Sequence, residues 1–333
     1  MGKTKATLKN ISETLQISIS TVSRALKDHP DIAEQTKKKV RELAEMMDYE
    51  PNAFAIYLRT NHSKLLGLIV PEISDYFYHS FIAAVEEEAR EKGYSLMILQ
   101  SGDNPETELA NLRLCKLNRV AGILVALSGS GRTEFSVFEK LEDGGIPVVF
   151  FDKVPENKGF STVCLADEDA GRLAAEALLR KSRRKVLAIF GKEDLTITRK
   201  RLQAFTQAFK NSGSDAVLQI LHAANRKDAQ QKTIDAFSLD PKADGLFCMS
   251  DEILAGAMKA VQELNIAVPE KLGIVSVSNG FIPGLFNPEI TYVETRGDQL
   301  GRASFREMSE RLENNGLPRE ETIGARIVEG KSL

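Results

Sequence analysis

From about residue 63 onwards, short apolar runs alternate with longer stretches whose apolar residues recur at helical spacing. The short runs are apolar throughout, which is typical of strands in a parallel sheet covered by helices on both faces. A chain with this rhythm folds as an α/β protein with doubly wound parallel sheets. The predicted strands are Leu65–Pro71, Tyr94–Leu99, Val120–Leu127, Ile146–Phe151, Lys185–Phe190, Ala216–Leu221, Gly245–Met249 and Gly273–Val277. The predicted helices are Phe81–Lys92, Glu106–Leu117, Glu134–Glu142, Ala170–Leu179, Arg199–Asn211, Asp228–Phe237, Glu252–Leu264 and Gln299–Leu312.

These units are too many for one open sheet, so we expect two doubly wound subdomains. We assign residues 63–163 plus 293–322 to the first and residues 164–292 plus 323–333 to the second. A strand-like tail, Thr322–Val328, is expected to cross back between them. Because ligands on such sheets bind beyond the carboxyl ends of the strands, two facing sheets predict a ligand cleft between them.

The first 62 residues show helical apolar periodicity only. We divide them into an all-helical N-terminal domain, residues 1–50, and a connecting segment, residues 51–62. Residues 1–27 hold five basic side chains against one acidic one, whereas the whole chain has 44 Lys and Arg against 47 Asp and Glu. Because an acidic body repels phosphate, the N-terminal domain is the candidate nucleic-acid surface.

The composition excludes several classes of protein. With 42% hydrophobic and 27% charged residues, the chain is typical of a folded globular protein. No apolar run approaches the ~20 residues of a membrane span, and none follows the basic N-terminus as in a secretory signal. The three cysteines are odd in number and lack CxxC spacing, which favours a reducing compartment. We therefore expect a cytoplasmic protein with no membrane partner.

Residues 7–26 predict two short helices joined by a tight turn. Thr7 and Ser18 are candidate N-caps, because a hydroxyl accepts a backbone N–H of the first turn. The second helix would bury Val22 and Leu26 and leave hydroxyl side chains and Arg24 outside. Such a face suits a DNA major groove, since hydroxyls approach phosphates and arginine binds guanine through two hydrogen bonds. An ordinary helical hairpin would show the same pattern.

Residues 17–26 (ISISTVSRAL), with 31–36, 49–53 and 55–58 in matching order, resemble the N-terminal region of lactose-repressor (LacI/GalR) family regulators. The resemblance implies a three-helix headpiece whose second helix reads the major groove. Base-edge contacts are then expected from Ile19, Ser20 and Arg24, and phosphate contacts from Thr7, Ser18, Thr21, Ser23 and Asn52.

The same resemblance makes residues 52–59 a hinge helix that forms on DNA beside its dimer mate. Leu58 would wedge the minor groove open, and Ala55 would allow close approach of the two hinges. So short a helix is not stable alone in water, which suits a switch. Gln16 stands where the family usually has glycine in the turn, and Ile56 where it commonly has arginine. These departures predict backbone strain at Gln16 and a missing DNA contact at Ile56.

The rest of the chain resembles the effector domain of this family and, beyond it, the periplasmic sugar-binding fold. Its landmarks include GLIVPEISDYF (67–77), PVVFFDK (147–153), RLQAF (201–205) and SDEILAG (250–256). The resemblance implies an effector cleft lined by Asp75, Phe77, Tyr78, Asp152, Lys153, Arg201, Asp251, Ser278 and Asn279. A salt bridge with a neighbour across the cleft is the alternative role of Arg201. Ser278 and Asn279 replace two aspartates common at this point in the family, which argues against a standard hexose.

Other chemistries fail on spacing. Asp167–Asp169 resembles the start of a calcium loop, but the turn glycine and the final glutamate are missing, so it predicts a helix start. Gly129–Gly131 does not complete GxGxxG, and the body holds only His79 and His222 as candidate general bases. We therefore expect no metal, no cofactor and no enzymatic activity.

Together these features predict a transcriptional regulator, of the repressor type, that binds a palindromic double-stranded operator. A sugar or related small molecule in the cleft would control it. The sequence ends without the leucine heptad that tetramers of the family can use, which favours a homodimer. Three alternatives remain open: an activator of the same family, a solute-binding protein and a cytoplasmic α/β enzyme.

Overall fold

The computed structural model describes residues 6–49, 63–129, 135–155, 159–239, 243–314 and 316–333. The chain divides into two compact units, Met1–Ser63 and Lys64–Leu333. We call the described residues 6–49 of the first unit the headpiece and the second unit the core unit. Among the described helices, none combines the length and the apolar character needed to cross a bilayer.

Within residues 6–49 the headpiece contains three helices: α1 (Leu8–Leu15), α2 (Ile19–Leu26) and α3 (Glu34–Met46). Their shared core is Ile11, Val22, Ala25, Val40 and Ala44. Both predicted N-caps are confirmed. Thr7 Oγ1 accepts a hydrogen bond from the Asn10 amide at 3.2 Å, and Ser18 Oγ accepts one from the Thr21 amide at 3.0 Å.

The turn between α1 and α2 contains the predicted strained residue. Gln16 has φ 53° and ψ 38°, in the left-handed region that favours glycine. A side chain in this region costs roughly 1–2 kcal/mol. The strain expected at Gln16 is therefore confirmed.

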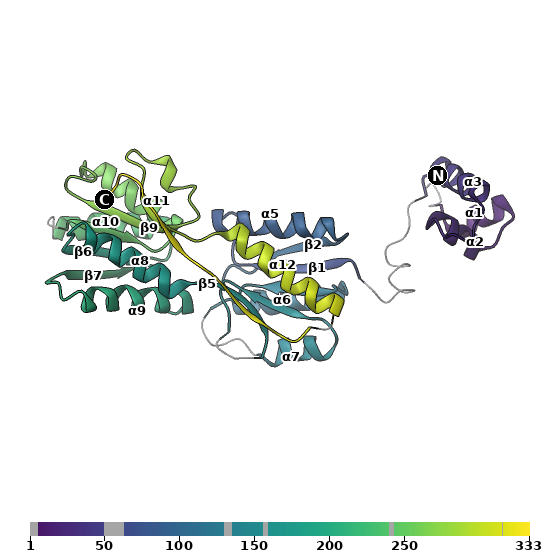
Figure 1. Cartoon of the computed structure of the whole chain (residues 1–333), viewed down its shortest axis with the longest axis horizontal. Coiled ribbons are helices and arrows are strands. Elements are labelled where there is room, and N and C mark those ends of the chain that lie inside the picture. Colours follow the sequence, from purple (N-terminus) through teal and green to yellow (C-terminus); the bar gives the residue numbers. More distant parts are fainter. Residues whose placement is uncertain (1–5, 50–62, 130–134, 156–158, 240–242, 315) are drawn as a thin grey trace. The chain divides into compact units, whose positions relative to one another are not determined.

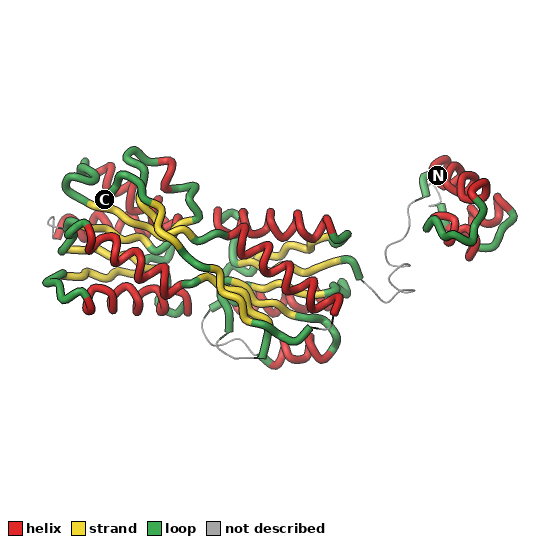
Figure 2. Tube along the Cα trace, in the orientation of Figure 1, coloured by secondary structure: helices red, strands yellow, loops and turns green. Residues whose placement is uncertain are grey.

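The core unit contains two six-stranded sheets (Figures 1 and 2). The first, in spatial order, is β11 (Glu320–Ile323), β5 (Ser161–Leu165), β4 (Val148–Phe151), β3 (Gly122–Val125), β1 (Leu65–Val70) and β2 (Ser95–Gln100), all parallel. The second is β12 (Arg326–Val328), β10 (Thr291–Glu294), β9 (Gly273–Ser278), β8 (Gly245–Cys248), β6 (Lys185–Phe190) and β7 (Val217–His222). Only β12 in this second sheet is antiparallel to its neighbour.

Helices cover both faces of the first sheet, as the apolar strands predict. The pair α5 (Tyr76–Glu91) and α12 (Gly297–Asn314) lies on one face, and α6 (Pro105–Leu117) and α7 (Ser136–Asp143) lie on the other (Figure 1). Alternate residues of β1 enter the two separate cores, with Leu68 on the α5–α12 side and Ile69 on the opposite side. We call this sheet and its four helices the N-lobe.

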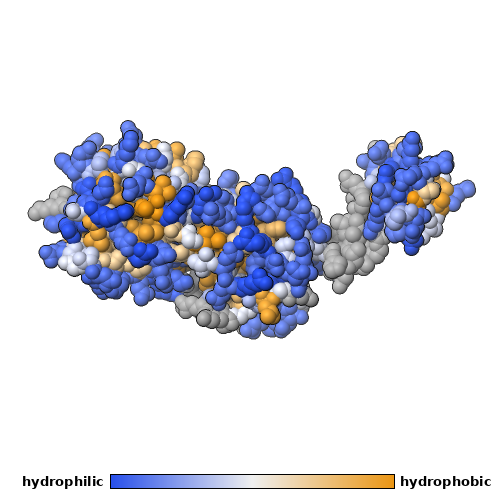
Figure 3. Space-filling model, in the orientation of Figure 1, coloured by the Kyte–Doolittle hydropathy of each residue, from blue (hydrophilic) through white to orange (hydrophobic). Residues whose placement is uncertain are grey.

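The second sheet and its helices form the C-lobe. Its helices pack in two pairs, α8 (Asp167–Arg180) with α9 (Thr196–Asn211) and α10 (Arg226–Leu239) with α11 (Asp251–Glu263). A short 3-10 helix, η1 (Pro283–Leu285), follows β9. On the face shown in Figure 3, the core unit is largely hydrophilic, with apolar patches over the C-lobe.

Three crossings connect the lobes, after β5, after β10 and between β11 and β12. Val163 lies inside β5, so the N-lobe continues to Leu165 rather than ending at residue 163. Because β10 belongs to the second sheet, the second crossing follows Glu294 rather than residue 292. The tail Thr322–Val328 does cross back, but it belongs to two strands, one in each lobe.

Candidate functional site

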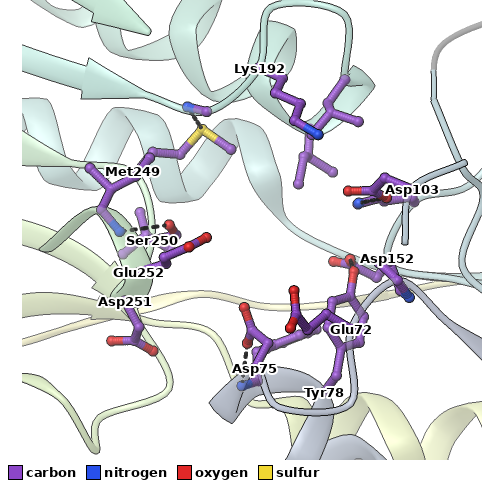
Figure 4. A pocket seen from close by; sticks show the side chains of 18 of the residues that line it. Glu72, Asp75, Tyr78, Asp103, Asp152, Lys192, Met249, Ser250, Asp251 and Glu252 are labelled. Atoms are coloured by element: carbon purple, nitrogen blue, oxygen red, sulfur yellow. Dashed lines mark hydrogen bonds and ion pairs between the residues drawn. The ribbon is translucent and has the colours of Figure 1, made fainter. Parts of the chain in front are cut away.

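A cleft of about 310 Å³ lies between the lobes, where the carboxyl ends of strands from both sheets meet (Figure 4). Loops after β1, β2 and β4 line it from the N-lobe, and loops after β6, β7, β8 and β9 line it from the C-lobe. The structure brings all nine expected effector residues into this lining: Asp75, Phe77, Tyr78, Asp152, Lys153, Arg201, Asp251, Ser278 and Asn279. Sequence reasoning did not name Glu72, Asp103, Lys192 and Glu252, which also line the cleft.

Arg201 of α9 forms a buried ion pair beside the cleft. Its Nε and Nη2 lie 2.8 and 2.7 Å from Asp167 Oδ1, and its Nη1 donates to the Met249 carbonyl at 3.1 Å. Arg201 is 5% exposed and Asp167, at the start of α8, is 4% exposed. Arg201 therefore forms a salt bridge, but with a residue of its own lobe rather than with a neighbour across the cleft. Since a guanidinium has five N–H groups, Arg201 still has donors to offer to the cleft.

Tyr78 holds Asp152 in place. Asp152 follows β4 with φ 56°, and its Oδ2 accepts a hydrogen bond from the Tyr78 hydroxyl at 2.6 Å. Burial, together with the nearby Asp152 carboxylate, raises the pKa of Tyr78 well above its usual value. The phenol therefore stays protonated and donates to Asp152. Asp152 Oδ1 has no hydrogen-bond partner among the described residues, so it can accept from a ligand.

Lys153 is neutralised by an ion pair with Asp103 in the loop after β2. Both side chains are largely buried. The rule that functional residues follow parallel strands would have found Asp103, because it lies three residues beyond the end of β2. In this conformation Lys153 positions that loop and presents no unpaired charge to the cleft.

Asp251 lies at the start of α11, and neutral groups bind its carboxylate. It accepts hydrogen bonds from the Ser278 hydroxyl and, at 3.3 Å, from the Asn279 amide. Burial raises the pKa of Asp251 to about 6, and repulsion by Asp75 adds to that shift. Ser278 thus acts here as a partner of Asp251. Asp75 in turn caps α5 by accepting from the Phe77 amide at 2.7 Å.

A polar and an aromatic contact join the lobes at the edge of the cleft. Asn279 Nδ2, in the C-lobe, donates to the Tyr76 carbonyl of α5 at 3.0 Å. The Tyr76 ring stacks on Phe281, with centroids 4.5 Å apart and an interplanar angle of 23°. Both contacts join the two lobes and stabilise the arrangement observed here.

The headpiece presents the predicted reading surface on α2. Ile19 is 48% exposed, and Ser20 and Arg24 are also exposed. Thr21 and Ser23 are half-buried, and Thr7 is exposed at the start of α1. Ser18 Oγ lies 2.7 Å from Ser20 Oγ and 2.8 Å from Thr21 Oγ1, so these hydroxyls are held together at the N-terminus of α2. The remaining expected DNA contacts, Asn52, Ala55 and Leu58, lie outside the described residues.

Two family matches cover most of the chain. Residues 63–328 match the family described as "Periplasmic binding proteins and sugar binding domain of LacI family". Residues 7–52 match the one described as "Bacterial regulatory proteins, lacI family". Together they span the headpiece and both lobes.

Similar proteins carry names of the same kind. The HTH-type transcriptional repressor PurR of Vibrio atlanticus (strain LGP32) is 25% identical over 311 residues, which cover 93% of this chain and 92% of that protein. The ribose operon repressor of Halalkalibacterium halodurans is 26% identical over 313 residues, which cover 93% and 92%.

Solved structures share the fold. The lac repressor dimer bound to operator and the anti-inducer ONPF superimposes with a TM-score of 0.90 at 18% identity, covering 99% of each chain. A periplasmic binding protein/LacI transcriptional regulator from Alkaliphilus metalliredigens QYMF, complexed with D-xylulofuranose, gives 0.70 at 25% identity, covering 81% of this chain and 99% of that one. The chain therefore belongs to the LacI family of bacterial regulatory proteins and is a regulator rather than an enzyme, with a DNA-binding headpiece followed by a periplasmic-binding-protein-like effector domain.

Proposed function

We propose that the protein is a repressor that binds a palindromic operator as a homodimer, and that a small molecule in the cleft sets its affinity for that operator. One observation carries the proposal. The same chain has an exposed helix, α2, that presents hydroxyl groups and an arginine, and a cleft between two lobes. Relatives with this organisation are named as repressors. The protein acts in the cytoplasm, where bacterial DNA lies.

On DNA, α2 lies in the major groove. Ile19, Ser20 and Arg24 contact base edges, while Ser18, Thr21 and the other predicted hydroxyl residues contact phosphates. The N-terminus of α2 supports this docking, because the positive end of a helix dipole favours an anion. The exposure of Ile19 and Arg24 allows both to reach the groove without rearrangement of the headpiece core.

The nine predicted cleft residues bind the effector. Because they come from both lobes, effector binding changes the position of one lobe relative to the other. Asp75 and Asp152 reach the ligand from the N-lobe, and Arg201 and Asp251 reach it from the C-lobe. A ligand that contacts both lobes favours their closed arrangement by the difference in its affinity for the two arrangements. Residues 52–59 transmit that change as a hinge between the headpiece and the core unit. Reciprocity then requires that operator DNA change effector affinity by the same factor.

We propose that the homodimer surface lies at the outer edges of the two sheets. β2 and β7 are edge strands, and each exposes isoleucine: Ile98 is 39% exposed and Ile220 is 37% exposed. An edge strand with exposed apolar side chains readily pairs with another chain. Leu114 and Leu117 of α6 extend this apolar surface in the N-lobe.

We expect the double variant Ile98→Glu/Ile220→Glu to be monomeric. It should bind operator at least about 100-fold more weakly, because each headpiece then binds its half-site independently of a second one. Sedimentation velocity and DNA titration measure the two effects. Leu317→Glu, which replaces an 82% exposed leucine outside both edge strands, is the matched control and should stay dimeric. A dimeric double variant would move the interface elsewhere.

Arg24→Ala is expected to relax base preference at one operator position and to cost about 1–3 kcal/mol of discrimination there. Competition binding against operators that vary one base pair at a time measures this. Lys38→Ala removes an equal charge from an exposed position of α3 and should leave the preference intact. Unchanged selectivity in the Arg24 variant would refute its placement at a base edge.

The direct test of the proposed function is selection of genomic DNA fragments by the purified full chain. The expected result is a palindromic site with half-sites about one helical turn apart. Recovery of no sequence above background would contradict the proposal. An activator of the same family would select DNA equally well, and its sign of action is read from transcription of the adjacent gene in a deletion strain.

A further inference from the structure

Carboxylates outnumber basic side chains in the cleft. The acidic residues that line it are Glu72, Asp75, Asp103, Asp152, Asp251 and Glu252, and the basic ones are Lys153, Lys192 and Arg201. Two of the bases are already neutralised, Lys153 by Asp103 and Arg201 by Asp167. Lys192 is exposed on the loop after β6. The cleft therefore carries an uncompensated negative charge.

The unpaired carboxylates include one from each lobe. Asp75 begins α5 in the N-lobe and Asp251 begins α11 in the C-lobe, and Figure 4 shows both beside the same cavity. Their partners are neutral donors: the Phe77 amide for Asp75, and the Ser278 hydroxyl and the Asn279 amide for Asp251. In the described part of the chain, neither carboxylate has a cationic partner. Burial raises the pKa of both carboxylates.

The cleft also offers a polar subsite that can both accept and donate hydrogen bonds. Asp152 and Arg201 are each 5% exposed and line the cavity. Asp152 Oδ1 lacks a hydrogen-bond partner among the described residues, and Arg201 has N–H groups beyond the three that bind Asp167 and Met249. An acceptor beside a donor in a largely buried setting suits hydroxyl groups, which both donate and accept.

We propose that the effector is a hydroxylated amine of the amino-sugar class, with its ammonium group between Asp75 and Asp251 and its hydroxyl groups on Asp152 and Arg201. The proposal rests on the proposed function only in taking this cleft as the effector site. An ammonium group supplies three donors and a positive charge, and charge-assisted hydrogen bonds are the strong ones. Because Asp75 and Asp251 belong to different lobes, one cation holds both lobes and favours their closed arrangement.

Other ligand classes fit less well. A phosphate or carboxylate group would meet the negative charge of the cleft and be repelled. A neutral sugar would bind Asp152 and Arg201 but would leave Asp75 and Asp251 desolvated without a counter-charge, which is costly. The charge of the cleft thus selects among molecules of similar shape.

The test is isothermal titration of the full chain with matched sets of probes. Each set contains a neutral hexose, its 2-amino form and its 6-phosphate, for D-glucose, D-galactose and D-mannose. At least one amine should bind about 30-fold or more tightly than its neutral and phosphorylated counterparts. That affinity should fall as the pH is lowered towards 5.5, because Asp251 takes up a proton there. A neutral or phosphorylated probe that binds as tightly as its amine, or the absence of binding by every amine, would overturn the proposal.

Charge-neutral variants locate the ammonium site. Asp75→Asn and Asp251→Asn should each weaken binding of the amine by about 30-fold or more, with the far-UV circular dichroism spectrum unchanged. Asp143→Asn removes the same charge from an exposed position of α7 outside the cleft and should leave affinity within about twofold. An equal loss in the Asp143 variant would show a general field effect and refute the site.

A second readout separates this proposal from the regulatory one. At about pH 6, binding of a cation beside Asp251 should release protons, so the apparent binding enthalpy should change with the ionisation enthalpy of the buffer. The same preparation is tested for operator binding. Amine binding without any DNA binding would keep the ligand assignment and refute the regulator, whereas DNA binding that responds only to a neutral sugar would refute the amine alone.

Discussion

Replacing Arg201 with alanine is expected to lower the free energy of unfolding of the core unit by about 3–5 kcal/mol, the range for breaking a buried ion pair from one side. Asp167, 4% exposed, would stay buried without its cation, and the Met249 carbonyl would lose a donor. Urea unfolding followed by far-UV circular dichroism measures the loss, since the chain has no tryptophan to report by fluorescence.

Two further variants identify the cause. Lys210→Ala, at an exposed position in the last turn of α9, should change stability by less than about 0.5 kcal/mol. Arg201→Met combined with Asp167→Leu removes both charges and should recover most of the lost stability. If Arg201→Ala alone unfolds at the same urea concentration as the parent chain, the pair is not buried as described. The same variant should also lose its response to the effector.

The second large effect is a loss of stability as pH rises, caused by Glu108. This side chain of α6 is 0% exposed, and among the described residues only one of its carboxylate oxygens has a partner, the Ser128 amide at 2.6 Å. Burial raises the pKa of Glu108 from 4.5 to about 7. Between these values the unfolded chain releases a proton that the folded chain keeps. Glu108 therefore destabilises the fold progressively from about pH 4.5 to about pH 7, by roughly 3 kcal/mol in total.

Glu108→Gln removes the charge while keeping an acceptor for the Ser128 amide. The variant should exceed the parent chain in stability by about 2–3 kcal/mol at pH 8 and match it near pH 4.5. Glu106→Gln, exposed in the first turn of the same helix, should change little at either pH. Other buried acids contribute pH dependence of the same sign, so the difference between the parent and each variant is the quantity to compare. A Glu108 variant with the parent's pH profile would contradict the assignment.

The architecture was predictable because most of its strands are short apolar runs that can be recognised in the sequence without knowledge of their neighbours in the sheet. The strands β5 and β10 were not predicted, since Ser161 and Thr162 interrupt the first and Thr291 and Glu294 bound the second. Their conformation is set by sheet neighbours, as β5 lies between β4 and β11 and β10 lies between β9 and β12. Because these two strands were missed, the predicted lobe boundaries at residues 163 and 292 lie before the ends of β5 (Leu165) and β10 (Glu294).

The position of the cleft residues was predictable, but their partners were not. A strand end followed by polar residues is visible in the sequence, and the resemblance to the LacI family supplied the rest. The pairs Arg201–Asp167, Tyr78–Asp152 and Asn279–Tyr76 join residues 34, 74 and 203 positions apart. Local patterns carry no information at such separations. The structure alone shows that Asp167 and Asp103 already neutralise Arg201 and Lys153, which leaves the cleft with a net negative charge.

In the proposed function, occupancy of the cleft changes the affinity of the headpiece for duplex DNA. The most direct measurement is the affinity of the full chain for its selected operator, titrated at two salt concentrations with and without a saturating cleft ligand. We expect operator affinity to fall steeply with salt, as phosphate contacts require, and to change at least about fivefold with ligand. Operator affinity that is independent of the ligand, or no salt-dependent affinity for any duplex, would contradict the account.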